Sequence, residues 1–240
     1  MADGITRTIN TSRGRTIVVM GHYGSGKTEF CVNLAMKMKD ECDKLALIDL
    51  DIANPYFRSR ERQKMLEDAG VAVIFNEYGF DIAEDLPAIT AKVRAPLENP
   101  EFTTIVDVGG NDSGARIMNQ FHKYFEPEET ERYLVINANR FETDTFEGAM
   151  FHLEQIRNEI QLPINGIINN THMLAETKAA DIIKGHELCR QVSEATGIPI
   201  VWDTCGEKFL AEVEAGEDVS DYRLFPIKLY MRPTWLDVTF

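Results

Sequence analysis

A glycine-rich loop follows a short β-branched run near the start of the chain, where residues 16–28 read Thr-Ile-Val-Val-Met-Gly-His-Tyr-Gly-Ser-Gly-Lys-Thr. The loop fits the pattern Gly-x-x-x-x-Gly-Lys-Ser/Thr. Its backbone N–H groups and the N-terminus of the following helix form a concave site for phosphate oxygens. In this pattern Lys27 reaches the β- and γ-phosphates of a nucleotide, and the Thr28 hydroxyl ligates Mg²⁺. The residues that we expect to contact the nucleotide here are Gly21, Gly24, Ser25, Gly26, Lys27 and Thr28.

Two aspartates end the next hydrophobic run, in the sequence Leu-Ile-Asp-Leu-Asp. Asp49 and Asp51 occupy alternate positions, so both side chains point the same way if the chain is extended. Close carboxylates repel each other unless a cation offsets their charge, as a Mg-nucleotide and the loop lysine would do. We expect Asp49 to support the hydrated metal and Asp51 to orient the nucleophile, with Lys27 and Asp51 as the catalytic residues. The alternative is that one or both aspartates only cap the following loop.

A third acid ends another hydrophobic run, Thr-Thr-Ile-Val-Asp-Val-Gly-Gly. Asp107 fits the second carboxylate that faces Mg²⁺ in phosphate-loop enzymes. Gly109 or Gly110 can bring a backbone N–H against the γ-phosphate, so residues 108–116 are a natural sensor of triphosphate versus diphosphate. The predicted metal site consists of Thr28, Asp49 and Asp107.

The sequence also bears on which base is bound. No Asn-Lys-x-Asp sequence occurs, so the usual acidic reader of guanine is absent, and ATP is the expected nucleotide. The run Gly-Ile-Ile-Asn-Asn-Thr-His offers Asn169 or Asn170, either of which has the donor and acceptor that adenine needs. These asparagines also suit an ordinary tight turn. Residues 202–206 are expected to form a loop that could cover the base with its backbone.

These sites need strands and helices to hold them, and the chain alternates between the two. Apolar or β-branched runs predict strands at 16–20, 45–49, 71–75, 103–107, 132–137, 164–169 and 198–202. Helical periodicity predicts helices at 27–39, 59–69, 87–96, 113–124, 145–160, 175–195 and 207–214. The pattern indicates an α/β fold, a single doubly wound, mostly parallel sheet with helices on both faces. Ligands bind at the carboxyl ends of such strands, where the glycine loop, the aspartates and the asparagines all lie.

The chain length of 240 residues predicts one phosphate-loop nucleotide-binding domain over residues 1–240. Its core is expected at about 14–215, followed by a C-terminal extension at about 216–240. The extension contains Arg-Leu-Phe-Pro-Ile-Lys-Leu-Tyr-Met-Arg-Pro, in which prolines interrupt the run and apolar residues alternate. Alternation does not suit a membrane-binding helix. We expect this stretch to pack on the edge of the protein's own core or to contact a partner.

Composition and charge argue against several classes of partner and location. The formal net charge of −14 would repel nucleic acid and anionic lipid, so neither is expected as a partner. No run reaches the roughly 18 apolar residues of a membrane span, and residues 1–15 lack the apolar core of a signal peptide, so we expect a cytoplasmic protein. The cysteines lack a Cys-x-x-Cys spacing, which favours reduced, structural thiols.

The order of these motifs resembles one branch of the phosphate-loop NTPases. The glycine loop, Ile-Asp-Leu-Asp-Ile, Val-Asp-Val-Gly-Gly and the strand-end Asn-Asn are similar to the MinD/ParA/CobQ type of the SIMIBI class. The resemblance implies that Asp49 supports Mg²⁺, Asp51 positions the attacking water and Asn170 reads adenine. MinD and ParA proteins carry a signature lysine after the first loop glycine, where this chain has His22, so activation across a dimer by that lysine is not expected. The loop is also similar to that of the HypB/UreG nickel-insertion GTPases, but their guanine motif and metal-binding residues are missing.

These observations together predict a Mg²⁺-dependent ATP-binding protein, a slow ATPase that acts as a switch. Segments 51–60 and 108–118 would report the nucleotide state to a protein partner or within a homodimer. A first alternative is a kinase or other transferase acting on a small molecule or polynucleotide, in which Asn54, Tyr56 and Arg58 hold the acceptor. A second alternative is a nucleotide-sensing binding module with negligible turnover.

Overall fold

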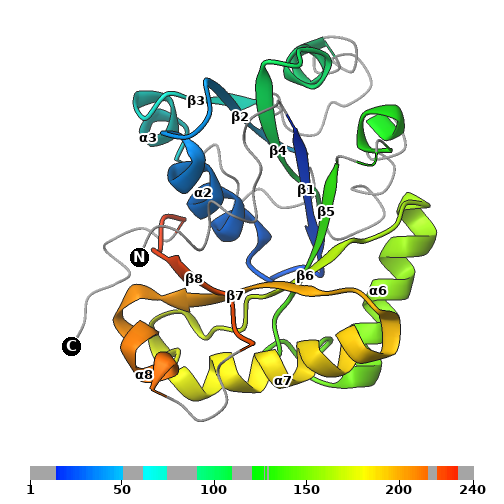
Figure 1. The fold of residues 1–240 in the computed structure, drawn as a ribbon, viewed down its shortest axis with the longest axis vertical. Coiled ribbons are helices and arrows are strands. Elements are labelled where there is room, and N and C mark those ends of the chain that lie inside the picture. Colours follow the sequence, from blue (N-terminus) through cyan, green and yellow to red (C-terminus); the bar gives the residue numbers. More distant parts are fainter. Residues whose placement is uncertain are drawn as a thin grey trace.

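The computed structural model describes residues 15–50, 62–74, 91–109, 121–126, 128, 130–215 and 221–231. Within them, eight strands form one sheet in which all neighbouring strands are parallel, in the order β3-β2-β4-β1-β5-β6-β7-β8 (Figure 1). The strands are β1 (Thr16–Gly21), β2 (Lys44–Asp49), β3 (Val71–Ile74), β4 (Phe102–Asp107), β5 (Glu131–Ile136), β6 (Gly166–Asn169), β7 (Ile200–Gly206) and β8 (Leu224–Ile227). The helices are α2 (Lys27–Met38), α3 (Gln63–Asp68), α6 (Phe146–Ile160), α7 (Ala179–Thr196) and α8 (Leu210–Glu214), with short 3-10 turns η2 (Leu174–Glu176) and η3 (Glu207–Phe209). Residues 91–98 and 121–125 are also helical.

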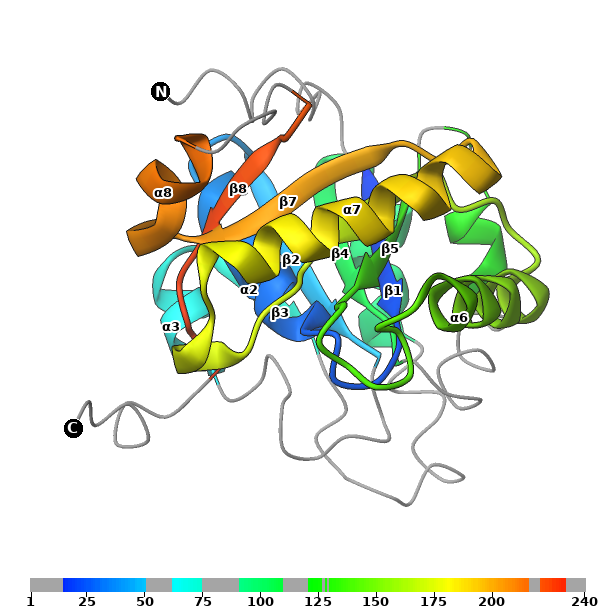
Figure 2. The same cartoon turned by 90° about the horizontal axis from the view of Figure 1, so that it is seen from below.

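Both faces of the sheet are buried, as the near-continuous hydrophobic strands predicted. Successive residues of a strand point to opposite faces, so Val18 of β1 packs into one core and its neighbour Val19 into the other. The core around Val18 includes Leu153 of α6 and Leu188 of α7, and the core around Val19 includes Phe30 of α2. Helix α2 therefore covers one side of the sheet, and α6 and α7 cover the other (Figures 1 and 2). The predicted doubly wound α/β fold is confirmed.

The strand order creates a switch point beside β1. From β1 the chain first builds the β4, β2 and β3 side of the sheet, and then the β5 to β8 side. Loops leaving the carboxyl ends of strands on either side of such a point diverge and leave room for a ligand. The glycine-rich loop follows β1 directly, so the fold places it at that position.

Strand β7 extends further than the sequence indicated. The expected loop over residues 202–206 is wrong, because β7 continues through Gly206 and pairs with β8. The reason is aromatic packing: the buried Trp202 ring lies 5.7 Å from Phe30, 5.4 Å from Tyr133 and 5.5 Å from Phe225, measured between ring centroids. Residues 202–206 are therefore part of the scaffold.

The edge strand β8 comes from the stretch beyond residue 215 and reads Leu-Phe-Pro-Ile, and an edge strand is the position in a sheet that tolerates a proline. The chain after β8 is tied to α2 by side-chain bonds to backbone. Asn33 donates to the Lys228 carbonyl at 2.9 Å and accepts from the Lys228 N–H at 2.8 Å. The Glu29 carboxylate accepts from the N–H groups of Tyr230 and Met231 at 2.6 and 3.1 Å. This segment packs on the chain's own core, beside the first turn of the helix that follows the glycine loop.

The cysteines are free thiols, and three of them are buried, which agrees with the structural role predicted from the sequence. In the part of the chain that the structure describes, no helix is both long and apolar enough to cross a membrane.

Candidate functional site

The glycine loop has the backbone shape of a phosphate cradle. Gly24 and Gly26 adopt left-handed φ angles of 74° and 85°, which favour glycine. A Cβ on Gly26 would lie 2.3 Å from Nδ2 of Asn170 and 2.9 Å from Nε2 of His172, so this position also needs glycine for close packing. The first N–H groups of a helix have no partner within the helix, and here they follow Gly26 directly. The arrangement suits an anion bound at the N-terminus of α2.

Lys27 lies across this loop. Its side chain is buried, at 5% exposure, and Nζ donates to the His22 carbonyl oxygen at 3.1 Å. A phosphate oxygen is a stronger acceptor for an ammonium group than a backbone carbonyl is, because the bond is assisted by both charges. The lysine is therefore held next to the place where phosphates would bind.

The predicted metal residues meet at the ends of β2 and β4. Asp49 and Asp107 are partners in register on these neighbouring parallel strands, and both are buried. The Thr28 hydroxyl donates to Oδ2 of Asp107 at 2.5 Å. One hydroxyl and two carboxylates are the hard oxygen donors that Mg²⁺ prefers, so the residues fit this ion. The described residues include no cluster of three or more His, Cys, Asp or Glu that could hold a metal.

Burial favours the neutral forms of Cys31, His22 and His172 around the loop. Burial raises the pKa of the Cys31 thiol well above its ordinary value, and the nearby Asp107 charge raises it further. Burial lowers the pKa of His22, and the neighbouring His152 lowers it too. Burial, aided by Arg140, lowers the pKa of His172 to about 4. Lys27 and Arg140 are therefore the cationic side chains that contact the loop in the described structure.

Two side chains from neighbouring loops hold the carbonyl groups of the glycine loop. Arg140, after β5, donates Nε to the Gly24 carbonyl at 2.8 Å. Asn170, after β6, donates Nδ2 to the Ser25 carbonyl at 2.7 Å and accepts from the Thr204 hydroxyl at 2.6 Å. The C=O and N–H of a trans peptide point in opposite directions, so holding the Ser25 carbonyl directs the N–H of Gly26 to the other side. Asn170 thus orients one of the amides expected to bind phosphate.

Replacing Asn170 by alanine is expected to weaken Mg-ATP binding about tenfold, because a buried hydrogen bond of about 1 kcal/mol and the orientation of the Gly26 amide are lost together. Isothermal titration calorimetry measures this. Asn165→Ala is the matched control, since the Asn165 amide likewise makes two hydrogen bonds, both of them to backbone, at the opposite end of β6. Equal loss of affinity in both variants, or none in Asn170→Ala, would contradict this role.

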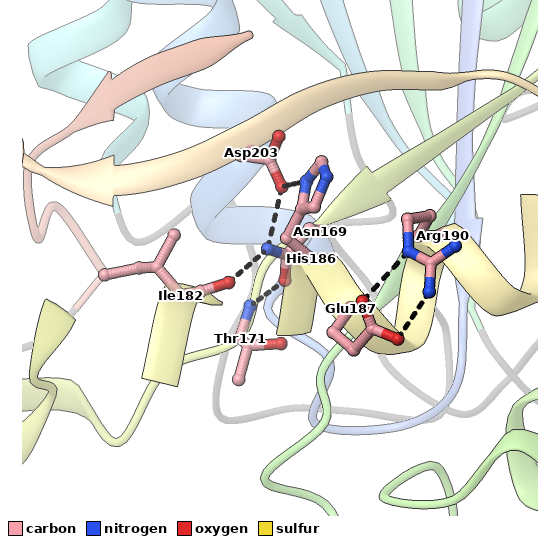
Figure 3. A network of polar contacts seen from close by, with 7 residues as sticks. All are labelled: Asn169, Thr171, Ile182, His186, Glu187, Arg190 and Asp203. Carbon is pink, nitrogen blue, oxygen red and sulfur yellow. Dashed lines mark hydrogen bonds and ion pairs between the residues drawn. The ribbon is translucent and has the colours of Figure 1, made fainter. Parts of the chain in front are cut away.

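Asn169 is part of a buried network at the ends of β6 and β7 (Figure 3). Its Nδ2 donates to the Ile182 carbonyl at 3.0 Å and to Oδ1 of Asp203 at 2.9 Å, while its Oδ1 accepts from the N–H of Thr171 at 3.2 Å. Nδ1 of His186 lies 2.9 Å from the same Asp203 oxygen. Both amide hydrogens of Asn169 are used inside the protein, where they join α7 to the strand ends.

The two asparagines therefore differ in what they can offer a base. Asn169 has no amide hydrogen left for a ligand, whereas the bonds of Asn170 to Ser25 and Thr204 leave one. The reading of adenine by either residue stays a prediction.

His22 occupies the position of the signature lysine, and its ring is held against α6. The centroids of His22 and His152 are 4.3 Å apart, with the rings tilted by 51°. The lowered pKa of His22 favours the neutral imidazole, and the expectation that it does not replace a cationic side chain stays a prediction.

Several predicted site residues cannot be placed. Asp51 and Gly110 lie outside the described residues, as do residues 54–58, so their roles stay predictions. The structure does bring together the other loop, metal and asparagine residues named from the sequence. It also adds Arg140, His172 and Thr204, which sequence reasoning missed. Their only signal was their position near the carboxyl ends of β5, β6 and β7.

Comparison with solved structures identifies the fold. The cell division protein FtsY of Thermotoga maritima is 25% identical, with a TM-score of 0.53 over 88% of this chain and 65% of that protein. The signal recognition particle receptor FtsY of Elizabethkingia anophelis is 19% identical, with a TM-score of 0.52 over 90% and 63%. The signal recognition particle 54 kDa protein of Aeropyrum pernix, in complex with GDP, is 24% identical, with a TM-score of 0.50 over 78% and 40%.

The fold is that of the SIMIBI class of phosphate-loop NTPases. This chain spans less than two thirds of the length of each of these three proteins. No protein-family model matches the sequence, and no curated protein matches it. The SIMIBI-type sheet places the glycine loop, Asp49 and Asp107 at the ligand-binding edge.

Proposed function

We propose that this chain is a Mg²⁺-dependent ATP-binding protein and slow ATPase, in which the bound nucleotide controls the interaction with a protein partner. The observation that carries the proposal is the joint geometry of Lys27, Thr28 and Asp107. The lysine lies across the loop, and the hydroxyl is already bonded to the carboxylate at the end of β4. We further propose that the chain forms one nucleotide-binding domain of the MinD/ParA/CobQ type.

The residues have separate roles in this proposal. The loop amides, Ser25 and Lys27 bind the β- and γ-phosphates, and Thr28 with Asp49 and Asp107 positions the metal, directly or through its water ligands. Bound Mg²⁺ would neutralise charge on the phosphate oxygens. Asp51 orients the attacking water, and the backbone at Gly110 contacts the γ-phosphate. Cleavage breaks the bond between the β,γ-bridging oxygen and the γ-phosphorus, and yields ADP and inorganic phosphate.

The choice of ATP over GTP rests on hydrogen-bonding groups. Guanine needs a carboxylate to accept from its ring N–H and amino group, and adenine needs an amide that both donates and accepts. Asp181 accepts from Asn139 through Oδ1 and from the Lys178 N–H through Oδ2, both at 2.8 Å, so both of its oxygens have partners inside the protein. Asp203 is fully buried and accepts from Asn169 through Oδ1, which leaves its Oδ2 without a hydrogen-bond partner among the described residues. The A. pernix protein and another E. anophelis FtsY structure hold GDP, which makes GTP the competitor to test.

ATP is expected to bind at least about tenfold more tightly than GTP, a difference of about 1.4 kcal/mol that one mismatched pair of hydrogen bonds can supply. Competition of unlabelled ATP and GTP against a fluorescent ATP analogue, in the presence of Mg²⁺, measures the ratio. A preference for GTP would overturn the proposed choice of adenine. Binding of either nucleotide with Mg²⁺ would still support the glycine loop as the phosphate-binding site.

A phosphate-release assay without any added acceptor tests the proposed reaction. The ATPase proposal expects slow, continuous release of phosphate from Mg-ATP by the chain alone. Release that requires an added hydroxyl acceptor would instead indicate a transferase. Tight binding of ATP without release would indicate a sensing module with negligible turnover.

A further inference from the structure

Three large aromatic side chains are exposed beside the glycine loop. Tyr23 lies in the loop itself and is 60% exposed, Phe141 follows β5 and is 89% exposed, and Phe151 lies on α6 and is 59% exposed. We call Tyr23, Phe141 and Phe151 the aromatic surface. A single exposed apolar residue is ordinary, but a group of aromatic residues in one place is typical of an interaction site.

Described contacts join the three residues to one loop. The Phe151 ring meets His152 edge-on, with centroids 5.4 Å apart, and His152 packs on His22, the residue before Tyr23. Arg140, the residue before Phe141, donates to the carbonyl of Gly24, the residue after Tyr23. The residue before Phe141 and the residue after Phe151 therefore both contact the glycine loop.

Three acidic residues lie close to Phe141 in the chain, beside the cation Arg140. Glu142, Asp144 and Glu147 are all exposed and lie within the eight residues that begin at Arg140. Glu147 is one helical turn before Phe151, on the same side of α6. A surface of aromatic rings among carboxylates suits a partner with apolar and cationic side chains. A second copy of this chain would bring the same acids and a net charge of −14, so self-association through this surface is disfavoured.

We propose that the aromatic surface docks a basic segment of a partner protein, in which lysine or arginine side chains flank an apolar anchor. The segment buries Phe141 and Phe151, and its cations pair with Glu142, Asp144 and Glu147. Because Tyr23 belongs to the glycine loop, the segment contacts the loop that we propose binds phosphate. A link between binding of this segment and the nucleotide bound at the loop rests on the proposed function, whereas binding of the segment itself does not.

Phage display of random twelve-residue peptides against the full chain tests the surface. The expected result is enrichment of peptides that combine an aromatic residue or leucine with at least two lysines or arginines. Enrichment of acidic peptides, or of none with this composition, would overturn the proposal. A fluorescent copy of the most enriched peptide then serves as the probe, and its affinity is measured by anisotropy.

Phe141→Ser and Phe151→Ser are each expected to weaken binding of this peptide about tenfold or more, since buried aromatic anchors dominate such interfaces. Ile183→Ser is the matched control, because Ile183 is an exposed apolar residue on α7 at 42% exposure. The double variant Glu142→Lys with Asp144→Lys is expected to weaken binding as well. The double variant Glu212→Lys with Glu214→Lys, at two exposed positions on α8, makes the same change of net charge and is the control. Unchanged affinity in the aromatic variants would overturn the proposal, provided that thermal melting shows them folded.

Two further measurements separate the possible failures. Multi-angle light scattering is expected to give the same mass for the wild type and for Phe141→Ser, while a dimer lost in this variant would assign the surface to a second copy of the chain. Calorimetry with Mg-ATP tests the nucleotide site independently. If the peptide binds and ATP does not, the proposed function is refuted and the docking surface is not. If ATP binds and Phe141→Ser leaves the affinity for the peptide unchanged, the docking surface is refuted and the proposed function is not.

Discussion

Replacing Lys27 by alanine is expected to lower the affinity for Mg-ATP by at least about 100-fold while the chain stays folded. The ammonium group lies across the loop and donates to the His22 carbonyl. Charge-assisted bonds from this group to two phosphates would account for a loss of about 3 kcal/mol or more. The fold should persist, because the side chain contributes a polar contact within a loop and does not belong to the hydrophobic core clusters.

Isothermal titration calorimetry measures this loss, and circular dichroism checks the fold. Lys39→Ala is the matched control, because Lys39 lies at the other end of the same helix and pairs with the exposed Asp40. The control is expected to bind Mg-ATP as the wild type does. A folded Lys27→Ala variant with unchanged affinity would show that the glycine loop is not the phosphate site.

Asp51→Asn is expected to bind Mg-ATP within about twofold of the wild type and to lose at least about 100-fold in kcat. An orienting carboxylate acts mainly when charge develops in the transition state, so its loss affects kcat more than binding. Single-turnover phosphate release measures the chemical step. Hydrolysis at the wild-type rate by Asp51→Asn would refute the assignment.

Substitutions of Asp49 and His22 test the other roles proposed beside that of Asp51. Asp49→Asn should raise the Mg²⁺ concentration needed for activity, since Asp49 is the register partner of Asp107, whose carboxylate accepts from the Thr28 hydroxyl. His22→Ala should change turnover little, because the imidazole is neutral and packs on His152. A collapse of turnover in His22→Ala would mean that this histidine does replace the signature lysine.

Much of the fold could be predicted from the sequence, because strands buried on both faces leave a strong local pattern. The runs that became β1, β2 and β4 are continuous in apolar or β-branched residues, and each precedes a loop residue named as functional. Strand β7 was harder. Its second half, Asp203 to Gly206, contains polar residues that suggest a loop, yet pairing with β8 and the buried Trp202 ring keep it extended.

The residues of the candidate site also divide into those that the sequence predicts and those that only the structure reveals. Residues contiguous with a motif, such as Lys27 and Thr28, could be named from spacing alone. The bonds from Arg140 and Asn170 to the loop carbonyls could not, because they join residues more than 100 positions apart and depend on how β5 and β6 sit beside β1. Asn170 was named for the base, and its bond to the Ser25 carbonyl adds a structural role that no local pattern encodes.

Hydrogen–deuterium exchange of the full chain, in Mg-ADP and in Mg²⁺ with a non-hydrolysable ATP analogue, tests the central claim most directly. A nucleotide-dependent switch requires segments whose backbone differs between the two states. The account predicts lower exchange in the triphosphate state over residues 51–60 and 108–118, with little difference in the strands of the sheet. Identical exchange in both nucleotides, when calorimetry shows both bound, would contradict the claim that this chain is a switch.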